Sequence, residues 1–249
     1  MRKFNRKNDQ IRDISIETNI NKNSDGSCII RLGDTHVICT ASFENDVPQW
    51  LKNGDSGWIT AEYGMLPGST STRNRREAAK GKQSGRTVEI QRLIGRSLRT
   101  VVDLKKIKGS QIIIDCDVIQ ADGGTRTASI SGAFVALSLA IKRLLNKKIL
   151  KENPIKDYLA AISCGILNEE IYIDLDYTED SQANVDANFI FSETLGIAEV
   201  QVSGERSTFK YEDLKQMIKM SEISVRKIFE IQKKAVSYTH LTLPTTPYV

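Results

Sequence analysis

Residues 119–134 read IQADGGTRTASISGAF, and the two glycines in the middle separate two different sequence patterns. The stretch that leads into them, IIIDCDVI at 112–119, is rich in β-branched residues and predicts a strand. The stretch that follows repeats apolar residues at helical spacing, namely Ile130, Phe134, Leu137, Ile141 and Leu144. The sequence therefore predicts a strand, a tight glycine turn and a long helix.

The first turn of this predicted helix lacks an acidic residue. Asp or Glu is favoured there, because the unpaired N–H groups and the helix dipole attract negative charge. This helix begins instead with Gly124, Thr125 and Arg126. Glycine lets the backbone approach an anion, and arginine can donate two hydrogen bonds to a phosphate. The turn is thus a candidate phosphate site, and the alternative is an ordinary turn with a surface arginine. The local residues alone do not decide between them.

The segments on either side of this junction continue an α/β pattern. Residues 27–42, SCIIRLGDTHVICTAS, predict two strands joined by a Gly-Asp turn, and residues 87–102 have helical spacing. In the second half, strand-like segments lie at 158–177 and 183–191, and a final helix is indicated by Leu214, Met217, Ile218, Val225, Ile228 and Phe229. Both halves contain β segments followed by a helix. We therefore predict an α/β (α+β) fold of two pseudo-repeated halves packed as one domain over residues 1–236.

Composition limits the class of protein. The chain has 249 residues, of which 40% are hydrophobic and 27% charged, as in globular proteins. The N-terminus MRKFNRKNDQ has no apolar core like that of a signal peptide, and no run approaches the length of a membrane span. We therefore expect a cytoplasmic protein. The scattered cysteines predict reduced, buried thiols rather than a disulfide framework or a zinc site; they are Cys28, Cys39, Cys116 and Cys164.

Histidine is scarce. The chain has only His36 and His240, so it has few residues for a Ser-His-Asp triad and too few for a histidine-rich metal site. An enzymatic site in this chain would use arginine, carboxylates and a hard cation. The C-terminal string VSYTHLTLPTTPYV resembles a translated sequencing adapter, and a genuine disordered terminus is the alternative. We expect residues 237–249 to be a non-native, disordered tail.

Basic charge is concentrated in one segment. Residues 73–106 hold eleven Lys and Arg residues against three acidic residues. Such a concentration is expected for a polyanion-binding surface, and a solvated helix face is the alternative. Glycines interrupt the first part of the segment, AAKGKQSGRT, which predicts a loop able to follow a phosphate chain. The candidate RNA-binding residues are Arg73, Arg75, Arg76, Lys80 and Lys82.

Three stretches together resemble the ribonuclease PH family. They are GGTRTASISGAF at 123–134, EYGMLPGSTSTRNRREAAKGKQSGRTVEIQRLIGRSLR at 62–99, and LDYTEDSQANVDANFIF at 175–191. The resemblance runs from the N-terminus to about Ala235. It implies a duplicated βαβα fold and a homohexameric ring built as a trimer of dimers. It also implies phosphorolytic 3′→5′ trimming of tRNA precursors, in which inorganic phosphate releases nucleoside 5′-diphosphates reversibly.

The resemblance also assigns residues. It implies that Arg86 joins Gly124, Thr125 and Arg126 in binding phosphate, and that Asp180 and Asp186 are the catalytic aspartates. We expect the two aspartates to lie on neighbouring rungs of a hairpin that turns near residues 179–183. There they would hold Mg²⁺, or one protonated carboxyl would act as a general acid. Asp115 and Asp117 would support the same site or pair with nearby arginines.

Three positions depart from the family pattern. Gly68 stands where an arginine is usual, Ser71 where a histidine is usual, and Val202 where a glycine is usual. These changes bear on RNA affinity and ring packing, because the phosphate and aspartate residues are retained. Two other functions remain open: a catalytically silent RNA-binding ring subunit, and a hydrolytic nuclease, which would need a water-activating site.

Overall fold

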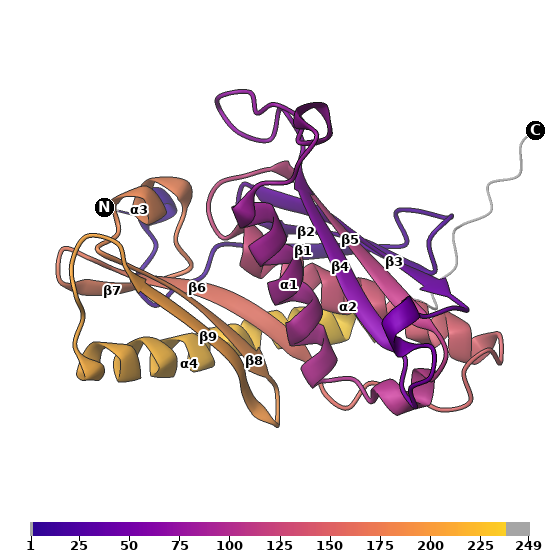
Figure 1. Cartoon of the computed structure of the whole chain (residues 1–249). Coiled ribbons are helices and arrows are strands. Elements are labelled where there is room, and N and C mark those ends of the chain that lie inside the picture. The colour runs from indigo at the N-terminus through magenta and orange to yellow at the C-terminus, as the bar shows by residue number, and fades with distance from the viewer. Residues whose placement is uncertain (1, 238–249) are drawn as a thin grey trace, which may run out of the picture.

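The computed structural model describes residues 2–237, and most of the predicted tail therefore lies outside the described residues. Two β-sheets lie side by side, with helices packed against them (Figure 1). The first half contains β1 (Ile14–Thr18), β2 (Gly26–Leu32), β3 (Thr35–Glu44), β4 (Trp58–Met65), α1 (Gly85–Thr100), β5 (Gln111–Gln120) and α2 (Thr125–Asn146). The second half contains β6 (Leu159–Leu167), β7 (Glu170–Ile173), α3 (Tyr177–Gln182), β8 (Val185–Ser192), β9 (Gly196–Gly204) and α4 (Tyr211–Ser237).

The first sheet has the strand order β1-β2-β3-β5-β4, and the second has the order β7-β6-β8-β9. All neighbouring strands are antiparallel except β4 and β5, which run parallel because α1 connects them. Short 3₁₀ helices lie at Lys3–Asn5, Gln49–Leu51, Ala78–Lys80 and Leu104–Ile107. Strands followed by helices in each half confirm the predicted α/β (α+β) fold.

The predicted strand pair at 27–42 forms the β2–β3 hairpin. Gly33 adopts φ +55°, a left-handed conformation that glycine adopts without steric cost, and this closes the turn beside Asp34. Along β3 every second side chain is buried, including Val37, Cys39 and Ala41. The alternation places one face of the first sheet on the core. All four cysteines are buried and free, as predicted.

Helix α2 is the central element of the core. Its predicted core face, from Ile130 to Leu144, is buried, and so are residues on its other sides, because the helix contacts both sheets and both α1 and α4. Small residues permit this close packing. A Cβ on Gly132 would lie 2.7 Å from the Cys39 sulfur, and a Cβ on Gly26 would lie 2.1 Å from the Ala136 carbonyl oxygen. By length and composition alone α2 could cross a membrane, contrary to the sequence-based expectation, but 83% of its apolar window is buried inside the protein.

Helix α4 packs against the second sheet and joins it to α2. Met217, Val225, Ile228 and Phe229 are buried with the strands of that sheet, as their helical spacing predicts. The buried Gln232 amide donates to the Ser131 and Leu159 carbonyl oxygens, each at 2.9 Å. These bonds fix the C-terminal helix to both halves. The long helix that closes the fold thereby holds the two sheets in one body.

Candidate functional site

The turn between β5 and α2 has the geometry that its two glycines predict. Gly123 and Gly124 adopt φ +74° and +63°, and Gly124 is the N-cap of α2. A Cβ on Gly123 would lie 2.5 Å from the Leu175 carbonyl oxygen, so a side chain there would collide with the backbone of the second half. The first turn of α2 contains no acidic residue. The unpaired N–H groups of this turn therefore have no acidic side chain within the turn to neutralise them.

Arg126 is held at this turn by neighbours from two other elements. Its Nη1 donates to Glu89 Oε1 of α1 at 3.3 Å and to Gln201 Oε1 of β9 at 3.2 Å. The guanidinium keeps further N–H groups for an anion. The Tyr63 hydroxyl, on β4, donates to Thr125 Oγ1 at 2.9 Å and so links the turn to the first sheet. Burial raises the pKa of Tyr63, although the positive charges of Arg86 and Arg126 act against the increase.

Arg86 reaches the same region from the start of α1. Ser84 caps this helix by accepting from the Thr87 N–H at 3.2 Å. Glu77 accepts from the Ser84 N–H and the Thr87 hydroxyl, which holds the preceding loop against the cap. Arg86 is exposed in the adjoining cleft. Its charge acts on Tyr63 and on both predicted catalytic aspartates, so it lies close to all three.

Asp180 lies on helix α3, and the predicted hairpin between residues 171 and 191 is wrong. Asp176 accepts from the Glu179 N–H and Glu179 accepts from the Asp176 N–H, a capping box that starts a helix where a turn was expected. Strands β7 and β8 do not pair with each other, because both pair with β6, one on each side. The strand-like run 158–177 ends earlier than predicted, since β7 stops at Ile173.

Asp186 lies on β8, opposite Gly165 of β6 and Ser203 of β9. Burial, together with the neighbouring Asp180 carboxylate, raises the pKa of Asp186 to about 6. Burial also raises the pKa of Asp180, and the positive charges of Arg86 and Arg126 act against that increase. The two aspartates are therefore electrostatically coupled, although the connection between them differs from the predicted one. A third carboxylate, Glu205, also acts on both through its charge, and no sequence motif pointed to it.

The donor set fits Mg²⁺ only in part. Among residues 2–237 no group of three or more His, Cys, Asp or Glu side chains is arranged to hold a metal ion. Mg²⁺ is commonly bound through one or two carboxylates, several waters and substrate phosphates. Asp180 and Asp186 satisfy that mode and do not form a complete protein cage.

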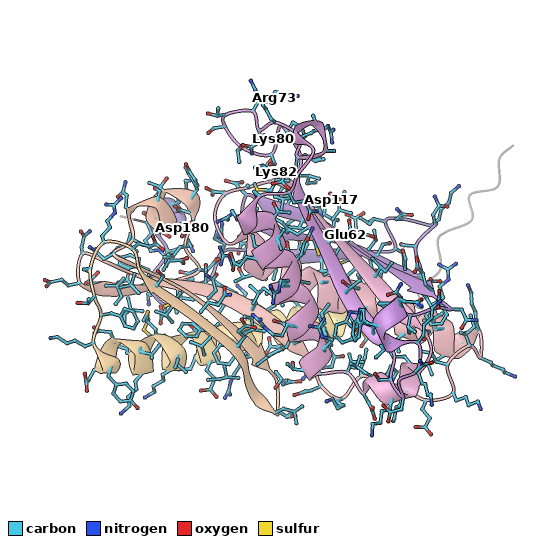
Figure 2. The ribbon with its side chains drawn as sticks, in the orientation of Figure 1. Glu62, Arg73, Lys80, Lys82, Asp117 and Asp180 are labelled. Atoms are coloured by element: carbon cyan, nitrogen blue, oxygen red, sulfur yellow. The ribbon has the colours of Figure 1, made fainter. Side chains whose placement is uncertain are left out.

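The candidate RNA-binding residues lie on the loop between β4 and α1, here called the basic loop. Arg73, Lys80 and Lys82 lie on a loop that projects from the first sheet (Figure 2), and Arg75 and Arg76 are exposed on the same loop. The cleft is lined by Arg75, Arg76, Lys80 and Lys82 together with Arg86, one of the predicted phosphate-binding residues.

Asp117 lines the same cleft. Burial and the nearby Asp115 carboxylate raise the pKa of Asp117. Asp115 accepts from the Thr40 hydroxyl at 3.2 Å. Within residues 2–237, no ion pair joins either aspartate to an arginine, so the suggested pairing with arginines is wrong.

The three departures from the family pattern replace neither aspartate and neither arginine of the site. Val202 is half-buried on β9 and packs on the second core. Gly68 and Ser71 are exposed in the basic loop, and a Cβ on Gly68 would have no heavy atom within 4 Å. Gly68 therefore stands at a position where the fold leaves room for a side chain.

Removing the Asp186 charge should stabilise the protein at neutral pH. The pKa of Asp186 rises from an ordinary 3.8 to about 6 on folding, so its favourable contribution is complete below pH 4 and is lost as the pH rises through 6. Asp186→Asn should therefore raise the free energy of unfolding by about 2–3 kcal/mol at pH 7.5, with the difference vanishing towards pH 4. Urea unfolding across this range measures it, and a pH-independent difference would contradict the assignment.

Comparison with known proteins identifies the family. Residues 10–143 match the first domain of the 3′ exoribonuclease family, RNase PH, and residues 157–224 match its second domain. The chain therefore belongs to this family. The first match ends in the last turn of α2 and the second begins just before β6, so the two matched domains correspond to the two sheets.

Solved structures share the fold. The chain is similar to rice (Oryza sativa) Rrp46, with 19% identity and a TM-score of 0.77 over 94% of this chain and 98% of that one. It is also similar to a chain of the Archaeoglobus fulgidus exosome with RNA bound to the active site, with 21% identity and a TM-score of 0.76 over 90% of each chain. An archaeal exosome core chain matches at 20% identity and a TM-score of 0.70, over 92% of this chain and 89% of that one.

Proposed function

We propose that this protein is a phosphorolytic 3′→5′ exoribonuclease that trims tRNA precursors in the cytoplasm. One observation carries the proposal. The start of α2 with Arg126, a second arginine at Arg86, and the carboxylates of Asp180 and Asp186 lie close enough for both arginine charges to lower the pKa of both aspartates. The arginines would bind phosphate as a substrate. The ribose 3′ oxygen that leaves must receive a proton or be stabilised by a cation.

In the proposed reaction Arg86 and Arg126 hold inorganic phosphate beside the last internucleotide linkage. An oxygen of that phosphate bonds to the linkage phosphorus, and the bond from this phosphorus to the 3′ oxygen of the preceding nucleotide breaks. The 3′ oxygen takes a proton, and the terminal nucleotide leaves as a nucleoside 5′-diphosphate. A phosphodiester is exchanged for a phosphoanhydride, so the reaction is reversible.

The aspartates serve the leaving oxygen. Asp186, whose pKa is raised to about 6, is protonated in part of the population near neutral pH and can donate to that oxygen. Alternatively, Mg²⁺ held by Asp180, an ionised Asp186 and RNA phosphates would neutralise the charge that develops on that oxygen. The two arginines keep Asp180 and Asp186 from repelling the incoming phosphate.

The basic loop is proposed to hold the RNA. Its cationic side chains lie next to Arg86 in the same cleft, so an RNA strand bound along the loop would present its 3′ end to the phosphate site. The RNA-bound exosome structure named above supports this function for the fold. We further propose a homohexameric ring, as the family resemblance implies.

A catalytically silent ring subunit is the second candidate, because the similar structures named above include exosome proteins. Such a subunit would bind RNA without needing the phosphate and carboxylate groups. This chain retains Arg86, Arg126, Asp180 and Asp186, and both arginines act through their charge on both aspartates, which favours the active enzyme.

The reaction class can be tested with a short RNA that has an unstructured 3′ end, incubated with the full chain and Mg²⁺. Nucleoside 5′-diphosphates should appear one at a time from the 3′ end only when phosphate is added, and excess nucleoside diphosphate should lengthen the RNA. Monophosphates released without phosphate would show a hydrolase. Tight RNA binding with no product under either condition would favour the silent subunit.

A further inference from the structure

A network of buried charges joins the N-terminal segment to the loop that precedes α3. Three arginines and three acids take part, and their charges balance; they are Arg2, Arg6, Arg12, Asp174, Asp176 and Glu179. The N-terminal segment that follows residue 1 lies beside α3 (Figure 1). This network was not predicted from the sequence, because a charged N-terminal segment resembles a solvated one.

Arg12 is the most buried arginine of the network, with its side chain 3% exposed. Its Nη2 donates to Asp174 Oδ1 at 2.7 Å, its Nε to Asp174 Oδ2 at 3.0 Å, and its backbone N–H to Asp174 Oδ2 at 2.7 Å. Although burial opposes a charge on Asp174, Arg12 holds the pKa of that carboxyl below its usual value. A buried ion pair is weak evidence for a role in stability, because desolvation offsets much of the attraction.

The same guanidinium also holds the glycine turn of the phosphate site. Arg12 Nη1 donates to the Asp122 carbonyl oxygen, and Nη2 donates to the Gly123 carbonyl oxygen at 3.5 Å. The buried Thr35 hydroxyl donates to the Gly123 carbonyl oxygen at 2.6 Å and accepts from the Asp122 N–H at 2.9 Å. The turn is thus fixed through two carbonyl groups and the Asp122 N–H, which leaves the N–H groups at the start of α2 for an anion.

Arg12 joins two segments that each lead into part of the candidate site. Asp174 adopts φ +56°, the left-handed conformation that ends β7 and directs the chain into α3 and Asp180. On the other side, Gly124 begins α2 and precedes Arg126. A Cβ on Gly123 would lie 2.9 Å from the Tyr177 nitrogen, so the turn and the start of α3 touch directly. Arg12 therefore spans the first and second matched domains where they meet at the site.

We propose that Arg12 and Thr35 are positioning residues: both hold the Gly123–Gly124 turn in its anion-binding conformation, and Arg12 also sets its position relative to α3. This inference rests on the proposed function for its kinetic consequences. Its consequence for phosphate binding follows from the geometry of the turn alone.

The test compares three variants of the full chain with the wild type. Arg12→Lys keeps the buried charge but loses the planar set of donors, and Thr35→Val keeps the shape but loses both hydrogen bonds to the turn. Arg31→Lys is the matched control, since Arg31 pairs with Glu17 on the exposed side of β2. Inorganic phosphate binding is measured by calorimetry, and kcat and the KM for phosphate and for RNA are measured in trimming assays.

Arg12→Lys should raise both the Kd and the KM for phosphate about tenfold and lower kcat about 10- to 100-fold, with the KM for RNA unchanged. Thr35→Val should raise the same phosphate constants with a smaller effect on kcat, because Arg12 keeps its contacts with Asp174, ahead of α3. Arg31→Lys should match the wild type.

A purely structural role would lower the melting temperature and leave the phosphate constants of the folded protein unchanged, which would overturn the inference. If Arg12→Lys does not fold, an unchanged phosphate Kd in Thr35→Val overturns it equally. Wild-type protein that binds phosphate but does not trim RNA refutes the proposed function alone, and the calorimetric comparison still decides the inference. Wild-type protein that binds no phosphate refutes both.

Discussion

Replacing Asp180 or Asp186 by asparagine should reduce the rate of RNA trimming by about 10²- to 10⁴-fold, the range that a general acid or base contributes. Asparagine keeps the shape of aspartate but can neither carry the negative charge nor donate the proton. Asp180→Asn also alters the other carboxylate, because the Asp180 charge contributes to the raised pKa of Asp186. The double variant should therefore be little slower than the slower single variant.

Measurements of RNA affinity distinguish a loss of catalysis in these variants from misfolding. RNA affinity should stay within about twofold of the wild type, because the basic loop and both arginines are unchanged, and counterion release at those cations dominates RNA affinity. Asp46→Asn is the matched control, since Asp46 is exposed beside Lys52 and lies outside the site. Mg²⁺-dependent turnover at the wild-type rate in both Asp180→Asn and Asp186→Asn would refute their catalytic role.

The elements that could be predicted are those determined by neighbouring residues. The β2–β3 hairpin follows from Gly33 between two apolar runs, and the start of α2 follows from the left-handed Gly124. The phosphate turn was proposed from the same residues, because the unpaired N–H groups of a helix start and the absence of an acid are visible in sequence. The long apolar repeat of α2 was also visible, although it did not reveal that the helix would be buried on every side.

The elements that could not be predicted depend on distant residues. A capping box at Asp176 and Glu179 was present in the sequence, yet the apolar alternation around it favoured a hairpin. The central position of β6 between β7 and β8 is set by tertiary packing, and it decides how Asp180 and Asp186 meet. Arg12 pairs with Asp174 across 162 positions, a separation that no local pattern predicts. The aspartates were assigned from the family resemblance and not from their spacing.

Removing either arginine of the proposed phosphate site should give the second large effect. Arg126→Ala and Arg86→Ala should each cost about 2–4 kcal/mol of transition-state stabilisation, as expected for loss of one charge-stabilising donor. That range corresponds to a decrease of about 30- to 1000-fold in kcat/KM for phosphate. Arg126→Lys should recover only part of the loss, because an ammonium group cannot form the paired hydrogen bonds of a guanidinium.

The phosphate dependence of these variants distinguishes their role from that of the basic loop. Trimming by Arg126→Ala should require much more phosphate while the KM for RNA stays near the wild-type value, since Arg126 is anchored by Glu89 and Gln201 at the turn and not in the loop. Arg31→Ala, on the exposed side of β2, is the control. Removing Arg126 also withdraws a positive charge that lowers the pKa of Asp180 and Asp186, so both carboxyls should stay protonated to higher pH. The pH–rate profile of Arg126→Ala should therefore shift upwards. Wild-type trimming at low phosphate would show that Arg126 does not bind the attacking phosphate, and an unshifted profile would place it too far from the aspartates to act with them.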